Sequence, residues 1–218
     1  MLQTTEPIVE NQDFIEAFLN CCRRRQYRSK ALVIQPGDPG NTLYYIMEGS
    51  VSVSIQEESG REMVLGYLNK GEFIGEVGVF LGENTRAVTV RTKEPCKLAE
   101  ISYKRLEQVL EGELAPYANE LLRTLGRQVS RRLLQTSRKV GHLAFLDVTG
   151  RIARTLMDLC KEPDAMTHPD GMQIRITRQE IGRIVGCSRE MAGRVLKTLE
   201  AEGLLKAQGK TIVVYGMR

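Results

Sequence analysis

The chain has 218 residues and a formal net charge of +4, and 42% of its residues are hydrophobic and 27% charged. That size allows one large or two small domains with a buried core, and the composition is ordinary for a globular protein. The sequence has no run of about 18 apolar residues and no signal peptide, which argues against a membrane partner and predicts a cytoplasmic protein. Its five cysteines form no C-x-x-C pair and no disulfide framework.

Short β-prone runs dominate residues 30–103. Five of them alternate or nearly alternate between apolar and polar residues, with glycine-containing turns between them: TLYYIM, SVSVSIQ, EMVLGYL, AVTVRT and KLAEISY. Strands at this spacing predict an antiparallel roll or sandwich. The basic stretch CCRRRQYR precedes this region, and its simplest interpretation is a solvated face.

One glycine-rich segment of this region has the chemistry of a phosphate site. Gly75 and Gly78 flank Glu76 and would let the backbone approach a ligand, while free amides at a short helical turn bind anions. Arg86 follows ten residues after Glu76 and could hold a phosphate with two N–H groups. Together these groups suit a nucleotide. The alternative is that the glycines only form turns and that the Arg–Glu pair is a salt bridge.

A long helix is predicted from Pro116 to about Phe145. Heptad spacing gives it an a/d seam about four heptads long, which is typical of a helix that pairs with another, and Thr136 is a polar member of this seam. The seam consists of Leu122, Gly126, Val129, Leu133, Thr136, Val140 and Leu143. We interpret the basic residues outside the seam as solvated: Arg123, Arg127, Arg131, Arg132, Arg138 and Lys139.

Residues 147–161 predict another helix, and the segment EPDAMTHPDGM after it predicts a loop. Residues 176–205 predict two short helices with a tight turn. Thr177 and Glu180 have capping-box spacing, and Ser188 can cap the second helix.

Two further signals complete this motif. Gly186 suits the left-handed residue that ends the first helix. The last segment predicts a hairpin that turns at Gln208-Gly209-Lys210, so the whole is a winged helix-turn-helix.

The second helix of the motif separates its polar and apolar residues. At about 100° per residue, one arc carries Arg189, Glu190, Arg194 and Lys197, whereas the opposite arc carries Met191, Ala192, Val195, Leu196 and Leu199. This pattern is typical of a recognition helix in the major groove of DNA. An ordinary αα-hairpin on the outside of a core is the alternative.

The whole chain resembles the bacterial cyclic AMP receptor protein family. The motifs that carry the resemblance are TLYYIMEGSV, REMVLGYLNKGEFIGE, AEISY, LAFLDVTGRIARTL, PDAMTHPDGMQI, ITRQEIGRIVGCSRE and GKTIVVYG. The resemblance implies an α+β fold with an N-terminal antiparallel β-roll of the cyclic-nucleotide-binding type (residues 1–115), a long dimerisation helix (116–146) and a C-terminal winged helix-turn-helix (147–218). It also implies a homodimeric transcription regulator that binds near-palindromic double-stranded DNA under the control of cyclic AMP.

The resemblance further implies residues for each site. The nucleotide site would comprise Gly75, Glu76 on the ribose hydroxyl, Arg86 and Ala87 at the cyclic phosphate, and Thr136 and Ser137 at the adenine, with Ser137 supplied by the second subunit. DNA would be contacted at base edges by Arg189, Glu190 and Arg194, and at phosphates by Thr177, Gln179, Ser188 and Lys210. RNA polymerase would meet Thr167 and His168 in the loop Ala165–Gly171, together with Arg23, Arg25 and Arg105.

The chain departs from the cyclic AMP type in two ways. The family has Arg-Ser at the phosphate, whereas this chain has Arg86-Ala87, and one lost hydrogen bond to a charged group costs roughly 1.5–3 kcal/mol. The segment LEQVLEGELAPYANELL is also longer. Both features are similar to the cyclic-AMP-receptor-like proteins of plant-pathogenic bacteria, which respond to cyclic di-GMP or are active without ligand. Cyclic di-GMP, or no ligand, is therefore the alternative trigger.

Two other functions are less well supported by the sequence. An iron–sulfur or haem sensor of the same superfamily is one, but the chain has no N-terminal cysteine cluster to hold iron and sulfur. An enzyme with His142 or His168 as a base is the other, but neither histidine has a neighbouring nucleophile, or an acidic residue at a spacing typical of a catalytic site. We therefore expect no catalytic activity.

Overall fold

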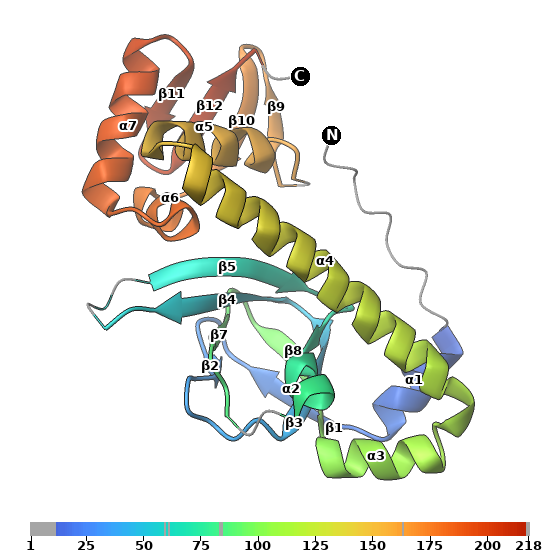
Figure 1. Cartoon of the computed structure of the whole chain (residues 1–218). Coiled ribbons are helices and arrows are strands. Elements are labelled where there is room, and N and C mark those ends of the chain that lie inside the picture. The colour runs from blue at the N-terminus through green and yellow to red at the C-terminus, as the bar shows by residue number, and fades with distance from the viewer. Residues whose placement is uncertain (1–11, 59, 61, 83–84, 163, 217–218) are drawn as a thin grey trace. The chain divides into compact units, whose positions relative to one another are not determined.

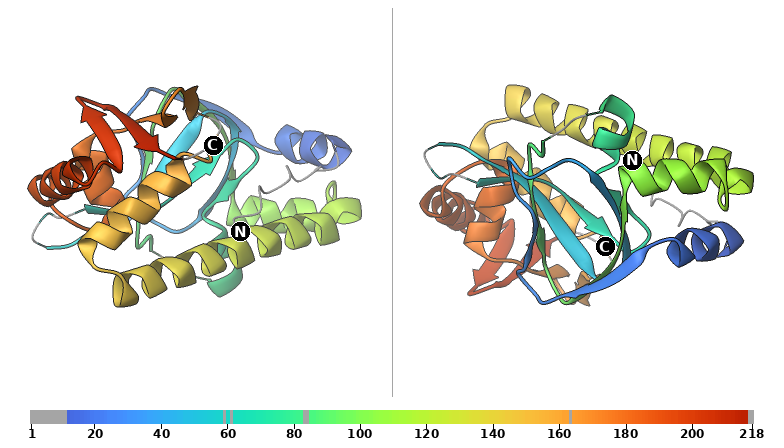
Figure 2. Two further views of the ribbon diagram at one scale, coloured as in Figure 1. Left: turned by 90° about the horizontal axis from the view of Figure 1, so that it is seen from above. Right: turned by 90° about the horizontal axis from the view of Figure 1, so that it is seen from below.

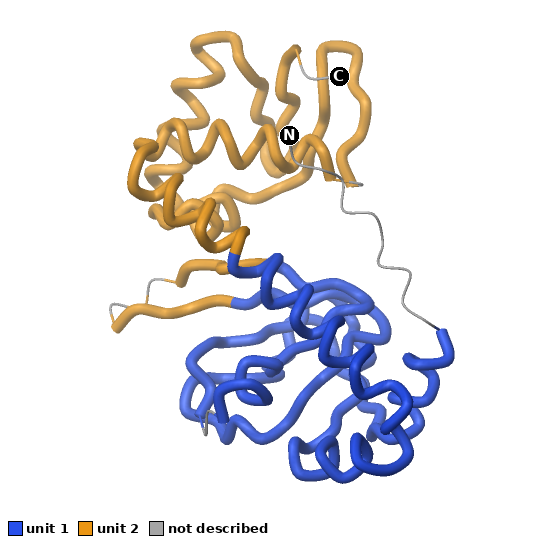
Figure 3. Tube along the Cα trace, turned by 45° about the vertical axis from the view of Figure 1, so that its right-hand side comes forward, with its two compact units in different colours: residues 1–53, 67–133 blue, residues 54–66, 134–218 orange. Residues whose placement is uncertain are grey.

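The computed structural model describes residues 12–58, 60, 62–82, 85–162 and 164–216. The chain forms two compact units, which are coloured separately in Figure 3. We call residues 1–53 with 67–133 the first unit, and residues 54–66 with 134–218 the second unit. Each unit has its own buried hydrophobic residues.

Two four-stranded sheets form the roll, and in the views of Figure 2 its strands curve around one interior. The strand orders are β1-β8-β3-β6 and β2-β7-β4-β5 (Figure 1). The strands are β1 (Arg23–Tyr27), β2 (Leu32–Ile34), β3 (Thr42–Glu48), β4 (Ser50–Gln56), β5 (Glu62–Asn69), β6 (Phe73–Ile74), β7 (Thr89–Thr92) and β8 (Cys96–Ser102). The pairings of β1 with β8, β3 with β8, β3 with β6 and β2 with β7 are antiparallel.

Aromatic side chains fill one end of the first unit. Phe14 and Phe18 from α1 (Gln12–Asn20) are buried, and the ring centroid of Phe18 lies 5.3 Å from that of Phe73. Tyr45 and Phe73 lie 4.9 Å apart. These tilted and edge-on contacts are the arrangements that aromatic quadrupoles favour.

Three helical segments complete the first unit and lead into the second. They are α2 (Glu76–Leu81), α3 (Tyr103–Glu111) and the 3₁₀ turn Ala115–Tyr117. The long helix α4 runs from Ala118 to Phe145 over 28 residues, so it begins two residues after the predicted Pro116, which lies in the 3₁₀ turn. The boundary between the units falls within α4, after residue 133.

The second unit packs three helices against a small sheet. The helices are α5 (Val148–Leu159), α6 (Arg178–Val185) and α7 (Arg189–Ala201), and the sheet has the order β11-β12-β10-β9. Its strands are β9 (Met166–His168), β10 (Gly171–Arg175), β11 (Leu205–Gln208) and β12 (Thr211–Tyr215). Apolar side chains from all three helices and the sheet meet in one cluster, including Ile152, Ile181, Leu196 and Ile212.

The predicted fold class is confirmed, with an antiparallel roll, a long helix and a winged helix-turn-helix. One prediction within it is wrong, because part of the expected loop 165–171 is strand. Thr167 pairs with Met172 and His168 with Gly171, which joins this segment to the sheet of the wing. Among the described residues, no helix combines the length and the hydrophobicity that a membrane crossing requires.

Candidate nucleotide and DNA-binding sites

The predicted phosphate segment is a short helix that begins and ends at left-handed glycines. Gly75 precedes α2 with φ 94°, and Gly82 follows it with φ 66°. The Gly78 amide donates to the Gly75 carbonyl at 3.2 Å. Glu76, the first residue of the helix, is buried. The sequence correctly placed a tight helical turn around a buried acid.

Arg86 comes back to this turn, but its guanidinium already has partners there. It donates through Nη1 to the hydroxyl of Tyr103 at 3.1 Å and through Nη2 to the Thr42 carbonyl. Tyr103 in turn donates to the Gly75 carbonyl at 2.5 Å, and burial raises the pKa of its phenol. Tyr103 therefore joins Arg86 to the glycine turn, a role that nothing in the local sequence indicated. Ala87, beside Arg86, is exposed.

Gly75 supports a prediction with a matched control. A Cβ at Gly75 would lie 2.7 Å from the Thr42 carbonyl oxygen and 2.8 Å from Nη1 of Arg86, whereas a Cβ at Gly71, which has φ 90°, would meet nothing within 4 Å. Gly71→Ala should cost only the left-handed strain, about 1–2 kcal/mol. Gly75→Ala should cost about 1–3 kcal/mol more, because the backbone or Arg86 must move.

Urea denaturation followed by circular dichroism measures both losses in the free energy of unfolding. Equal losses for the two variants would show that the close packing around Gly75 is unimportant.

Glu76 is paired with a residue of the long helix that sequence reasoning missed. Arg132 contacts the Glu76 carboxylate through Nη1, donates through Nη2 to the Phe73 carbonyl at 2.6 Å, and lies 3.6 Å from Glu72. The Glu76 side chain is only 5% exposed. The Nε of Arg132 is buried and has no hydrogen-bond partner among the described residues.

A second residue of α4 contacts the same segment. Gln128 is buried, accepts from the Phe73 amide at 2.9 Å and donates to the Gly71 carbonyl at 3.2 Å. The interpretation of the basic residues as solvated is confirmed for Arg123, Arg127, Arg131 and Arg138, which are exposed, and is wrong for Arg132 and Lys139. Arg132 and Lys139 both contact backbone carbonyls, Arg132 that of Phe73 and Lys139 that of Val64.

The predicted seam of α4 leaves large apolar side chains in water. Leu133 is 65% exposed and Val140 59% exposed, and Leu122 and Leu143 are also exposed. A helix that exposes apolar residues at heptad spacing is typical of one that pairs with a partner helix. Thr136 and Ser137, the predicted adenine contacts, are exposed and lie on the part of α4 that belongs to the second unit.

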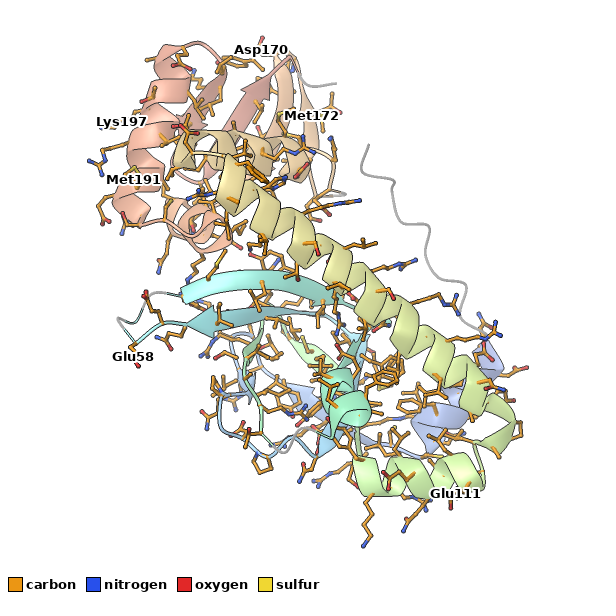
Figure 4. The ribbon with its side chains drawn as sticks, viewed as in Figure 1. Glu58, Glu111, Asp170, Met172, Met191 and Lys197 are labelled. Atoms are coloured by element: carbon orange, nitrogen blue, oxygen red, sulfur yellow. The ribbon has the colours of Figure 1, made fainter. Side chains whose placement is uncertain are left out.

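The helix-turn-helix begins and ends as its sequence predicted. The Thr177 hydroxyl accepts from the Glu180 amide at 3.1 Å, and the Ser188 hydroxyl accepts from the Met191 amide at 3.1 Å. Gly186 ends α6 with φ 74°. Helix α7 buries Ala192, Val195, Leu196 and Leu199 and exposes Arg189, Glu190, Arg194 and Lys197. Figure 4 labels Lys197 and Met191 on this helix.

Glu190 is suited to accept hydrogen bonds. Its own backbone amide and the Ser188 hydroxyl hold the pKa of its carboxyl below the usual value, and Arg189 and Arg194 act in the same direction. The group is therefore ionised at neutral pH and can accept from a cytosine amino group.

The remaining predicted DNA contacts lie around the start of α6. Gln179 is exposed in its first turn, and Lys210 is exposed in the turn of the wing. The Ile176 amide donates to the Lys210 carbonyl at 2.8 Å, so the wing is joined to the residue before Thr177. Arg178, which the sequence analysis did not select, lies against the recognition helix at Gly193, because a Cβ at Gly193 would lie 3.5 Å from its Cδ.

The predicted polymerase residues lie in both units. Thr167 is exposed on β9, and His168 lies 3.7 Å from Asp170. Arg23 and Arg25 are exposed on β1, a strand that the sequence did not predict, and Arg25 lies over the Tyr27 ring at 5.1 Å. Arg105, the fifth predicted polymerase residue, forms an ion pair in which its Nη2 lies 3.1 Å from Oε1 of Glu113.

Two family models match the chain. Residues 24–113 match the cyclic nucleotide-binding domain, and residues 150–217 match the Crp-like helix-turn-helix domain. These ranges contain the phosphate turn and the recognition helix, respectively.

Curated relatives match nearly the whole chain. The CRP-like protein Clp of Xanthomonas campestris pv. campestris is 57% identical over 204 residues, which cover 94% of this chain and 89% of that protein, and Clp of Xanthomonas oryzae pv. oryzae gives the same values.

Solved structures agree with these matches. The c-di-GMP responsive global regulator CLP of Xanthomonas campestris has a TM-score of 0.91 and 56% identity, covering 95% of this chain and all of that one. A CRP/FNR-family regulator of Thermus thermophilus has a TM-score of 0.71 at 23% identity, covering 89% of this chain and 94% of that one, and shares the fold.

Proposed function

Because the chain belongs to the CRP family of DNA-binding transcription regulators, we propose that it binds near-palindromic DNA as a homodimer and that a cyclic nucleotide held by the roll modulates its DNA affinity. The observation that carries the proposal is the exposed polar arc of α7, opposite an apolar face on which Ala192, Val195, Leu196 and Leu199 are buried. In this assignment Arg189, Glu190 and Arg194 read base edges. Thr177, Gln179, Ser188 and Lys210 contact phosphates and set the register.

Selection from a random duplex pool tests the DNA-binding role. It should return a two-fold symmetric sequence whose half-sites are about 34–36 Å apart, because the recognition helices of a dimer enter successive major grooves. Recovery of sequences without two-fold symmetry would refute a homodimer on a near-palindrome.

Arg189→Ala tests base reading. The variant should lose about 1–3 kcal/mol on the selected sequence and discriminate less at one base pair of each half-site, because an arginine that donates two hydrogen bonds to guanine is removed. Fluorescence anisotropy with single-base variants of the duplex measures both effects. Gln179→Ala is the control, since a phosphate contact should weaken all duplexes alike. If Arg189→Ala also weakens all duplexes alike, Arg189 contacts phosphate and does not read bases.

Cyclic AMP is the first proposed effector. The match to the cyclic nucleotide-binding domain supports it, as does the left-handed turn at Gly75 beside Glu76 and Arg86. The unpartnered Nε of Arg132 offers a further donor for a ligand oxygen. Thr136 and Ser137 remain the proposed adenine contacts.

Cyclic di-GMP inhibition is the second proposal, with ligand-free activity as its variant. It is favoured by the pairing of Glu76 with Arg132, which a ribose hydroxyl would have to share, and by Ala87, which has no hydroxyl. The c-di-GMP responsiveness of the Xanthomonas campestris CLP at 56% identity also supports it.

Calorimetric titration of the pure protein with each nucleotide, repeated in the presence of the selected duplex, separates the two effectors. Binding of cyclic AMP that raises DNA affinity supports the first proposal. Binding of cyclic di-GMP that lowers DNA affinity supports the second, and DNA binding unaffected by either nucleotide supports ligand-free activity.

We also propose the three-part division into residues 1–115, 116–146 and 147–218, and a cytoplasmic location where DNA is accessible. RNA polymerase would contact Thr167 and His168 on β9 and the basic residues Arg23, Arg25 and Arg105. The exposed positions of Thr167, Arg23 and Arg25 support this assignment.

A further inference from the structure

The turn between β4 and β5 belongs to the second unit, although most of the roll does not. We call residues 54–66 the hairpin tip, which carries Glu58, labelled in Figure 4. Among the described residues, Glu62, Met63 and Val64 of the hairpin tip contact the rest of the second unit, and none of these three belongs to the predicted sites. These contacts reach α6, the turn after it and the last part of α4.

An ion pair joins the hairpin tip to the first helix of the helix-turn-helix. The Glu62 carboxylate lies 3.1 Å from Nη2 of Arg183 on α6, and its other oxygen accepts from the Ser54 hydroxyl at 2.8 Å. Ser54 is buried, so this bond fixes the carboxylate within the hairpin tip. The side chains of Glu62 and Arg183 are 26% and 46% exposed. Water therefore screens the pair only in part.

Two further contacts hold the same surfaces together. A Cβ at Gly186, the residue that ends α6, would lie 3.7 Å from Cε of Met63 and 4.0 Å from Leu143. The Lys139 ammonium on α4 donates to the Val64 carbonyl, and burial lowers the pKa of that lysine. The hairpin tip thus contacts α6, its terminal glycine and α4 through three consecutive residues.

We propose that the hairpin tip fixes the orientation of the helix-turn-helix on α4, with Glu62 and Arg183 as positioning residues. Gly186 lies two residues before Ser188, which caps the recognition helix, so a contact at Gly186 acts close to the start of α7. The exposed Arg189, Glu190 and Arg194 remain available to DNA in this arrangement. In the proposal, the orientation that the hairpin tip stabilises is the one that binds DNA. The proposal rests on the proposed DNA-binding function.

The test measures the affinity of the ligand-free, full-length protein for the selected duplex. Glu62→Gln and Arg183→Gln should each weaken binding about two- to fivefold, the effect of a partly exposed ion pair on an equilibrium. The double variant should bind the duplex no more weakly than either single variant, because both substitutions remove the same interaction. Glu58→Gln, an exposed carboxylate of the same hairpin tip, should leave the affinity unchanged.

A charge exchange provides a second, independent measurement. Glu62→Lys should weaken binding, and adding Arg183→Glu should restore it, since the pair is re-formed with the charges reversed. Unchanged affinity in the single variants, or additive losses in the double variant, would overturn the proposal. So would tighter binding by Glu62→Gln, because it would mean that Glu62 holds Arg183 away from a DNA phosphate.

The failure of this inference differs from a failure of the proposed function. If the wild-type protein binds no duplex from the selection, the DNA-binding function itself fails. If the wild-type protein binds and the Glu62 and Arg183 variants bind equally well, only the positioning role fails.

Discussion

Leu133→Asp should convert the proposed dimer to monomers and reduce affinity for the two-fold DNA site by about 100-fold or more. The side chain is 65% exposed at a seam position of α4, and an aspartate there would place two carboxylates face to face between paired helices. A monomer loses the effective concentration that links two half-sites, which is worth about 10²–10⁴ in affinity. Sedimentation velocity and fluorescence anisotropy measure the two effects.

Leu134→Asp is the matched control. Leu134 is 60% exposed, almost the same as its neighbour, but it lies one residue outside the heptad seam. Because one residue turns the helix by about 100°, its side chain should face solvent in the dimer. If both variants dissociate, or neither does, the helices do not pair through the predicted seam.

Arg132→Ala should destabilise the first unit by about 3 kcal/mol, the lower end of the range for breaking a buried ion pair. The guanidinium contacts the Glu76 carboxylate and the Phe73 carbonyl, and without it a carboxylate that is only 5% exposed loses its cation. Chemical denaturation measures the loss, and hydrogen exchange of the amides in residues 71–78 should report local opening.

Two variants isolate the charge effect. In a Glu76→Gln background, Arg132→Ala should cost markedly less, because a neutral amide needs no counter-charge. Arg131→Ala removes an exposed neighbour and should change the free energy of unfolding by less than about 0.5 kcal/mol. If Arg132→Ala costs as much in the Glu76→Gln background as in the wild-type protein, Arg132 acts by packing and not by charge.

The Arg132–Glu76 pair also bears on the choice of effector. A nucleotide that binds Glu76 through its ribose must either share this carboxylate or displace the guanidinium. In the second case, part of its binding free energy is spent on breaking the pair. Arg132→Ala should therefore alter cyclic AMP affinity through Glu76, and the calorimetric titration can be repeated on this variant.

Much of the DNA-binding half was predictable from local sequence. Thr177, Gly186 and Ser188 act within three or four residues of their partners, so spacing alone placed the helix ends correctly. The amphipathic pattern of α7 likewise predicted which residues are buried and which are exposed. The same local reasoning missed α1, α3, β1 and β2, and it assigned β9 to a loop. The two helices have nine residues each, which is shorter than the window of about 11–18 residues in which helical periodicity is recognised, and the three strands have only three to five residues.

The linear sequence was enough to predict the order of the roll, the long helix and the recognition helix, together with the residue types of each proposed site. The partner of each charged group, in contrast, follows from the packing of distant segments. Arg132 pairs with Glu76, which is 56 residues earlier in the chain. Tyr103 links Arg86 to Gly75 by hydrogen bonds. Glu62 forms an ion pair with Arg183 of α6. Periodicity predicts which face of a helix is polar. It does not predict which residues pack against that face, because contacts between distant segments depend on how the elements pack and not on local spacing.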